Sequence, residues 1–173
     1  MANLRKRTNQ SDKREEREKK EFDNKVLDVA RVTRVVAGGK RMRFRACVIA
    51  GNRNGKIGMG VRKGLDVADA VGKATRTAEK TMISVSLVEG TIPHEVYQKT
   101  GAAKLILKPA SRGTGIVAGG PIRAVLELAG VQNVAAKILG TNNKINNAQA
   151  AINALASLRS KEKSRALREI ARR

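Results

Sequence analysis

The sequence predicts an α+β protein built from two small units. Three observations on the spacing of its apolar residues support this class. From Arg41 onward apolar and cationic residues alternate, which is the period of a β-strand. Between Asp66 and Met82 the apolar residues fall at helical spacing. After Gly90 short strand-like and helix-like segments alternate, as in a layered α/β domain. We therefore expect a β-sheet plus helix, followed by a small α/β two-layer domain.

The chain carries a large excess of positive charge. Its 173 residues include 36 Lys and Arg but 15 Asp and Glu, a net charge of +21. Residues 26–158 alone hold 20 basic and seven acidic residues, so the excess is not confined to the termini. A charge of this size favours nucleic acid as the partner.

Composition along the chain predicts four segments. Residues 1–25 are a charged extension that we expect to be disordered, because it has almost no apolar content. Residues 26–88 form the first unit and 89–158 the second. Residues 159–173 are a basic tail, for which a solvated segment and an arm that orders on RNA are equally open readings.

The stretch from Gly38 to Gly64 predicts a hairpin with two different faces. On its first strand the cationic side holds Arg41, Arg43 and Arg45, and the apolar side holds Met42, Phe44, Ala46 and Val48. Asn52–Gly55 is the turn, where we expect Asn54 and Gly55 to supply positive φ angles.

On the return strand the same alternation places the remaining side chains. We expect Ile57, Met59 and Val61 on the apolar side, and Lys56 and Arg62 on the cationic side. Gly58 and Gly60 leave the backbone bare, so a partner could approach closely. Between Val29 and Leu65 there are ten Lys or Arg and no Asp or Glu, a segregation that predicts contact with a polyanion.

The other elements follow from local signals. Asp66 is the expected N-cap of the first helix, Gly130 ends the helix that Pro121 begins, and Asn146 or Asn147 caps the last one. The expected strands are Val26–Val36, Ile83–Val88, Glu95–Thr100, Lys104–Lys108 and Val131–Leu139.

The sequence disfavours an enzyme. The glycine-rich loop Pro109–Gly120 precedes a helix, but no Lys-Ser or Lys-Thr follows it and the G-x-G-x-x-G spacing fails. We expect this loop to pack against protein or RNA. His94 has no partner ligand in sequence, and no carboxylate cluster emerges, so neither a metal nor a cofactor is expected.

Cys47 is the single cysteine and is expected to be a small core residue. A reducing cytoplasm fits this usage, and no apolar run approaches the ~20 residues of a membrane span.

Two stretches closely resemble the family of bacterial-type small-ribosomal-subunit protein five. The first match is carried by Gly39-Lys40, Phe44, Ala46, Ile49, Asn52, Gly55, Ile57-Gly58 and Gly60; the second is KPASRGTGIVAGGPIRAVLELAGVQNV. The resemblance implies a first domain like a double-stranded-RNA-binding fold, and a structural protein that binds rRNA. It also implies small-subunit proteins four and eight as neighbours, with mRNA nearby and a role in translational accuracy.

The candidate residues fall into three groups. The expected rRNA contacts are Arg31, Arg34, Lys40, Arg41, Arg43, Arg45, Arg53, Asn54, Lys56, Arg62 and Lys63. The resemblance implies an antibiotic-proximal loop with Thr33, Arg34, Gly38 and Gly39, near bound spectinomycin. It also implies a protein interface at Gly115 and Arg123, where we expect any side chain at Gly115 to intrude.

The chain departs from the family pattern at two places. Lys144 follows Asn143 where the family often has proline, and Arg112 stands where an acidic residue is common. Two other functions stay open at this point: a free regulator that binds double-stranded RNA, and a phosphotransferase built on the second unit.

Overall fold

The computed structural model describes residues 22–159, so the expectations for residues 1–21 and 160–173 lie outside the described residues. The expectation of disorder is wrong for Asp23–Lys25, because these residues pair with the inner end of the second strand. The elements, in order, are β1 (Asp23–Val36), β2 (Gly39–Gly51), β3 (Lys56–Gly64), α2 (Val67–Lys80), β4 (Ile83–Ser84), β5 (Val96–Thr100), β6 (Ala103–Pro109), β7 (Ile116–Val117), α3 (Gly120–Ala129), β8 (Val134–Ile138) and α4 (Lys144–Ala156). The α+β class is confirmed.

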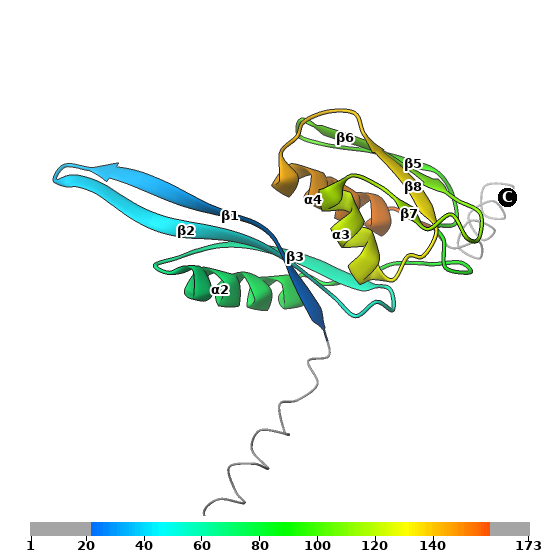
Figure 1. Ribbon diagram of the computed structural model, residues 1–173, viewed down its shortest axis with the longest axis horizontal. Helices are drawn as coiled ribbons and strands as arrows, with labels where there is room; N and C mark the ends of the chain where they lie inside the picture. The colour runs from blue at the N-terminus through cyan, green and yellow to red at the C-terminus, as the bar shows by residue number, and fades with distance from the viewer. Residues whose placement is uncertain (1–21, 160–173) are drawn as a thin grey trace, which may run out of the picture.

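The first unit is an antiparallel sheet in the order β1-β2-β3-β4, with α2 packed on one face (Figure 1). Asp66 caps α2 as predicted, because its carboxylate accepts a hydrogen bond of 2.7 Å from the N–H of Val67. Only alanines (Ala70, Ala74 and Ala78) are buried on α2, so the helix lies close to the strands. The hairpin of β1 and β2 extends away from the second unit.

The bare backbone at Gly58 and Gly60 receives this helix. A Cβ atom at Gly58 would overlap the carbonyl oxygen of Ala78, and one at Gly60 would overlap that of Ala74. The expectation that these glycines admit an external partner is therefore wrong. They permit close packing of α2 within the chain.

The strand register also corrects the predicted faces of β3. Gly60 lies opposite Val48 and Arg62 opposite Ala46, so Arg62 is on the α2 face with the buried residues. Met59 lies opposite Ile49, which puts the apolar residues of β3 on the face that carries the arginines of β2. That face is apolar at its inner end because the second unit packs there.

The second unit is a sheet in the order β5-β6-β8-β7, in which β7 runs parallel to β8. Helices α3 and α4 cover one face of it (Figure 1). Gly130 ends α3 in the left-handed conformation, with φ of 86°, as predicted. The last helix begins earlier than predicted. Asn143 caps it by accepting from the N–H groups of Ile145 and Asn146, and Asn147 is buried.

Two predicted strands are shorter in the structure. The segment Ile83–Val88 forms a strand only at Ile83–Ser84, and the strand expected over Val131–Leu139 covers Val134–Ile138. At the turn between β2 and β3 the positive φ angles belong to Arg53 and Gly55, not to Asn54. Asn52 fills the structural role instead, because its Oδ1 accepts from the N–H groups of Asn54 and Lys56.

The two units share one hydrophobic core. Ile49 and Ile57 of the first sheet are fully buried together with residues of α3 and α4. The turn after β2 docks on the end of α3, where the N–H of Arg53 donates to the carbonyl of Leu128 at 2.9 Å. This hydrogen bond holds the turn between β2 and β3 against the second unit.

Candidate nucleic-acid interface

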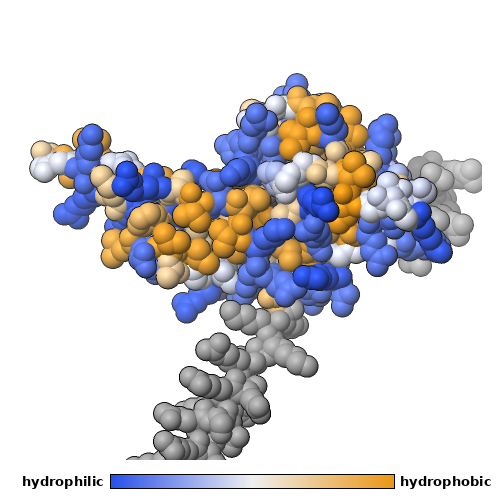
Figure 2. All heavy atoms as spheres, in the orientation of Figure 1, coloured by the Kyte–Doolittle hydropathy of each residue, from blue (hydrophilic) through white to orange (hydrophobic). Residues whose placement is uncertain are grey.

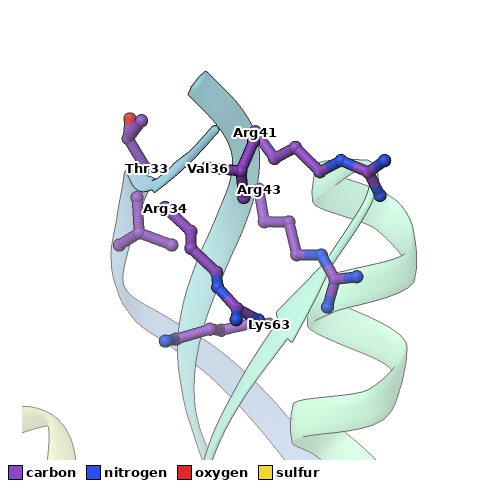
Figure 3. A pocket seen from close by; sticks show the side chains of 7 residues that line it. Thr33, Arg34, Val36, Arg41, Arg43 and Lys63 are labelled. Atoms are coloured by element: carbon purple, nitrogen blue, oxygen red, sulfur yellow. The ribbon is translucent and has the colours of Figure 1, made fainter. Parts of the chain in front are cut away.

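Four cations surround a hollow on the outer part of the β1–β2 hairpin. The hollow has a volume of about 470 Å³ and is lined by Val32, Thr33, Arg34, Val36, Arg41, Arg43 and Lys63 (Figure 3). We call Arg34, Arg41, Arg43 and Lys63 the hairpin cations. Each of them is exposed to solvent.

The register explains why these side chains share one face. Arg34 lies directly opposite Arg41, and Lys63 lies opposite Arg45, two residues beyond Arg43 on β2. Opposite residues of an antiparallel pair point to the same face. The alternation of β2 therefore gathers charge from three strands.

The hairpin cations differ from their neighbours in their counter-ions. Within residues 22–159, none of the four has a carboxylate oxygen within 4.0 Å. Arg45, in contrast, lies 3.5 Å from Asp28, and Arg53 lies 2.9 Å from Asp23. The segregation expected from sequence holds at the outer part of the hairpin, because the nearby acids of β1 neutralise only its inner part.

The other predicted contacts do not join this cluster. Arg31 lies opposite Phe44 on the α2 face, and the Nε of Arg62 donates to the Oγ1 of Thr77 at 2.8 Å. Lys40 lies next to the hairpin tip, Lys56 lies beside β4, and Asn54 is in the turn that docks on α3. The predicted residues thus divide between two faces and one turn.

The glycine-rich loop is held by a side chain that the sequence reasoning did not single out. The Oδ1 of Asn133 accepts from the N–H groups of Gly113 at 3.1 Å and Gly115 at 3.0 Å. These N–H groups are therefore occupied, which argues against phosphate binding there. An asparagine just before a buried strand and remote from the loop gives no local signal of this contact.

Gly115 adopts a left-handed conformation with φ of 73°, and a Cβ there would meet nothing within 4 Å. The expectation that a side chain at Gly115 would intrude is wrong within this chain, because the side chain would project outward. A substitution would instead cost backbone strain.

Arg123 donates from Nε to Glu127 at 2.9 Å, and Lys25 of β1 reaches the same carboxylate at 3.1 Å. Lys25 and then Arg123 hold the pKa of Glu127 below its ordinary value.

Both departures from the family pattern form ion pairs within the chain. Arg112 lies 2.8 Å from Glu89, and Lys144 lies 3.2 Å from Asp28. The second pair joins the start of α4 to β1, so it fastens the two units together.

Groups suited to catalysis are not gathered in the part of the chain that the structure describes. No set of three or more His, Cys, Asp and Glu residues could hold a metal ion there. Cys47 is a buried core residue, and burial, followed by the charge of Asp28, raises the pKa of its thiol to about 11. No helix of residues 22–159 is both long and apolar enough to cross a membrane.

Comparison with known proteins decides the family. Residues 22–86 match the N-terminal domain of ribosomal protein S5, and residues 98–171 match its C-terminal domain. The chain belongs to the ribosomal protein S5 family. Small ribosomal subunit protein uS5 of Thermotoga neapolitana is 47% identical over 150 residues, which cover 87% of this chain and 84% of the relative. The uS5 proteins of Thermotoga maritima and Thermotoga petrophila are each 45% identical over the same shares. The family supports a structural role in the small ribosomal subunit, and the chain is not an enzyme.

Proposed function

We propose that the chain binds small-subunit rRNA through the hairpin cations. The observation that carries the proposal is the cluster of four exposed cations around one hollow, unpaired with acids within residues 22–159. Phosphate groups would supply the missing negative charge. Few aromatic side chains are needed, since backbone contacts to folded RNA do not require base stacking.

The finer roles implied by the resemblance belong to the same proposal. The protein acts in the cytoplasm, assists assembly of the subunit, and supports accuracy near the path by which mRNA enters. Proteins four and eight are its neighbours. The loop with Thr33, Arg34, Gly38 and Gly39 lies near bound spectinomycin, and it borders the hollow of the hairpin cations. Residues 26–88, joined by the start of β1 at Asp23, and residues 89–158 act as its two domains, and the tail 159–173 follows them.

The interface role of Gly115 and Arg123 has its own test. Arg123→Leu should raise misreading of near-cognate codons, scored with a readthrough reporter, while the variant still enters subunits. Arg123 is exposed, so its loss should leave the fold intact. Normal error rates with normal incorporation would contradict this role.

The experiment on rRNA binding compares two triple variants. Arg34, Arg41 and Arg43 are replaced by Gln in one, and the acid-paired Arg45, Arg53 and Arg112 in the other. Each phosphate contact contributes roughly 0.7 to 0.9 to the slope of log affinity against log salt, so the first variant should lose about two to three units. The second should lose less than about one. The measurement is a salt titration of binding to a structured rRNA fragment.

Equal loss of slope in the two variants would show that net charge, not the hairpin cations, drives binding. The alternative function, a free regulator of double-stranded RNA, has the same binding chemistry. Sedimentation separates the two: a small-subunit component travels with ribosomal subunits, whereas a free regulator does not.

A further inference from the structure

The second sheet has an outward face that no element of residues 22–159 covers. Helices α3 and α4 pack on its other face. The register aligns three ranks of outward side chains across the strands: Lys108, Ala135 and Val117; then Tyr97, Ile106 and Lys137; then Lys99, Lys104 and Leu139. Glu95, just before β5, joins the first rank through its ion pair with Lys108. We call this set the open sheet face.

The centre of the open sheet face is apolar. Tyr97, Val117 and Leu139 are 56%, 55% and 52% exposed, and Ile106 lies half-buried between them. A shallow hollow of about 220 Å³ is lined by Ile106, Lys108, Val117, Ala135, Ala136, Lys137 and Leu139. Figure 2 shows apolar atoms at the surface of the second unit where β6 lies. Adjacent exposed apolar residues with a polar rim mark a binding surface.

The rim of this face is cationic. Lys99, Lys104, Lys108 and Lys137 are all exposed. The one acid in the three ranks is Glu95, which lies at the edge and pairs with Lys108 at 3.3 Å. Lys99, Lys104 and Lys137 have no carboxylate within 4.0 Å in residues 22–159.

Charge complementarity narrows the occupant to an acidic partner. The terminal segments 1–21 and 160–173 are both net basic, and a second copy would bring a charge of +21. All three would place positive charge against the lysines. A sheet face that binds single-stranded RNA stacks bases on two or three aromatic rings, but this face has one, Tyr97, among aliphatic side chains. The phosphates of folded RNA would pair with the lysines but would offer no apolar surface to Val117 and Leu139, whereas an acidic protein can supply both.

We infer that the open sheet face docks a partner protein that has an apolar centre and a rim of Asp and Glu. Ile106, Leu139 and Tyr97 supply the apolar contact, and the lysines pair with the carboxylates at its edge. This inference rests on the proposed function, because the partner is sought among the proteins that surround the chain in the small subunit.

The test introduces the photocrosslinker p-benzoylphenylalanine into the full chain at Tyr97 in one variant and at Leu139 in another. A third variant carries it at Val35, which is 73% exposed on the first unit. Crosslinking is induced in intact cells, and mass spectrometry identifies the attached species. Tyr97 and Leu139 should attach to one surface of a single protein, with Asp or Glu beside the attachment points, and Val35 should not attach to that surface.

Charge reversal then tests the rim. With the crosslinker at Tyr97, Lys104→Glu together with Lys137→Glu should lower the yield at least about tenfold, because like charges would face each other. Lys80→Glu on α2 should leave it unchanged. Attachment of Tyr97 and Leu139 to RNA, or to no macromolecule, would overturn the inference, as would an unchanged yield after reversal. Sedimentation of the same chains with subunits is scored separately, so failure of the proposed function is distinguishable.

Discussion

The two halves of β2 differ in sequence and in surroundings: the outer half holds four Lys or Arg, and the inner half holds none. The outer half, Gly39–Arg45, is largely exposed and borders the hollow of the hairpin cations. The inner half, Ala46–Gly51, is buried on both faces, by α2 on one and by the second unit on the other. The same strand thus serves as a surface at one end and as core at the other.

The charge that stays free on β2 depends on where its counter-ions lie. Asp23 and Asp28 stand early in β1, and antiparallel pairing carries them beside the inner half of β2. They neutralise Arg45 and Arg53 but do not reach Arg41 or Arg43. The cationic segment therefore has a neutralised end and a free end, although its own sequence contains no acid.

The largest effect is expected where the inner half meets α2. Gly60→Ala should lower the free energy of unfolding by about 3 kcal/mol, because the added Cβ would overlap the carbonyl oxygen of Ala74. Urea denaturation measures this change. Gly72→Ala is the matched control: it lies inside α2 with open space around it, so it should raise stability by about 0.5 to 1 kcal/mol. Equal stability of the two variants would refute the close packing of α2 on β3.

The contrast between free and occupied polar groups extends to the glycine-rich loop. Asn133→Leu removes the acceptor of two N–H groups and should cost about 2 kcal/mol. Amide hydrogen exchange at Gly113 and Gly115 should become faster. Asn133→Asp keeps the acceptor oxygens, so exchange there should stay slow. Fast exchange in the Asp variant would mean that the amide of Asn133 acts in some other way.

The sequence predicts best what depends on near neighbours. Asp66 and Gly130 act as caps through contacts within a few residues, and alternation in β2 places its arginines on one face. The faces of β3 were predicted wrongly, because the number of residues in the turn sets the register, and the turn itself is shaped by docking on α3.

The site is less predictable than the fold because its decisive contacts are distant in sequence. Asn133 is 18 residues beyond Gly115, and Lys144 is 116 residues beyond Asp28. Composition identified the cationic stretch, but it could not tell which cations are neutralised. That distinction arises only when the fold places β1 and α4 beside β2.

Removing one counter-ion should free a cation where the two halves of β2 meet. Asp28 binds both Arg45 and Lys144, so Asp28→Asn frees a cation at the inner end of the hairpin. If Arg45 then meets phosphate, the salt slope of rRNA binding should rise by roughly 0.7 to 0.9. The Asp28→Asn, Arg45→Gln double variant is the control and should return to the wild-type slope. A rise that persists without Arg45 would assign the new contact to another residue.

The smallest effect is expected at the ion cluster that joins β1 to α3. Glu127 accepts from Lys25 and Arg123, which lower its pKa from the ordinary value of 4.5. A carboxyl group with a lowered pKa in the folded state stabilises fully above its unfolded pKa, and this contribution is lost as pH falls through the folded pKa. Glu127→Gln should therefore cost on the order of a few tenths of a kcal/mol at pH 7, because the group is partly exposed. The difference from wild type should shrink below about pH 4.5 and vanish at lower pH. Urea denaturation of both proteins across this range measures it, with the exposed Glu79→Gln on α2 as control. A difference that stays constant with pH would show that Glu127 acts through packing rather than through its charge.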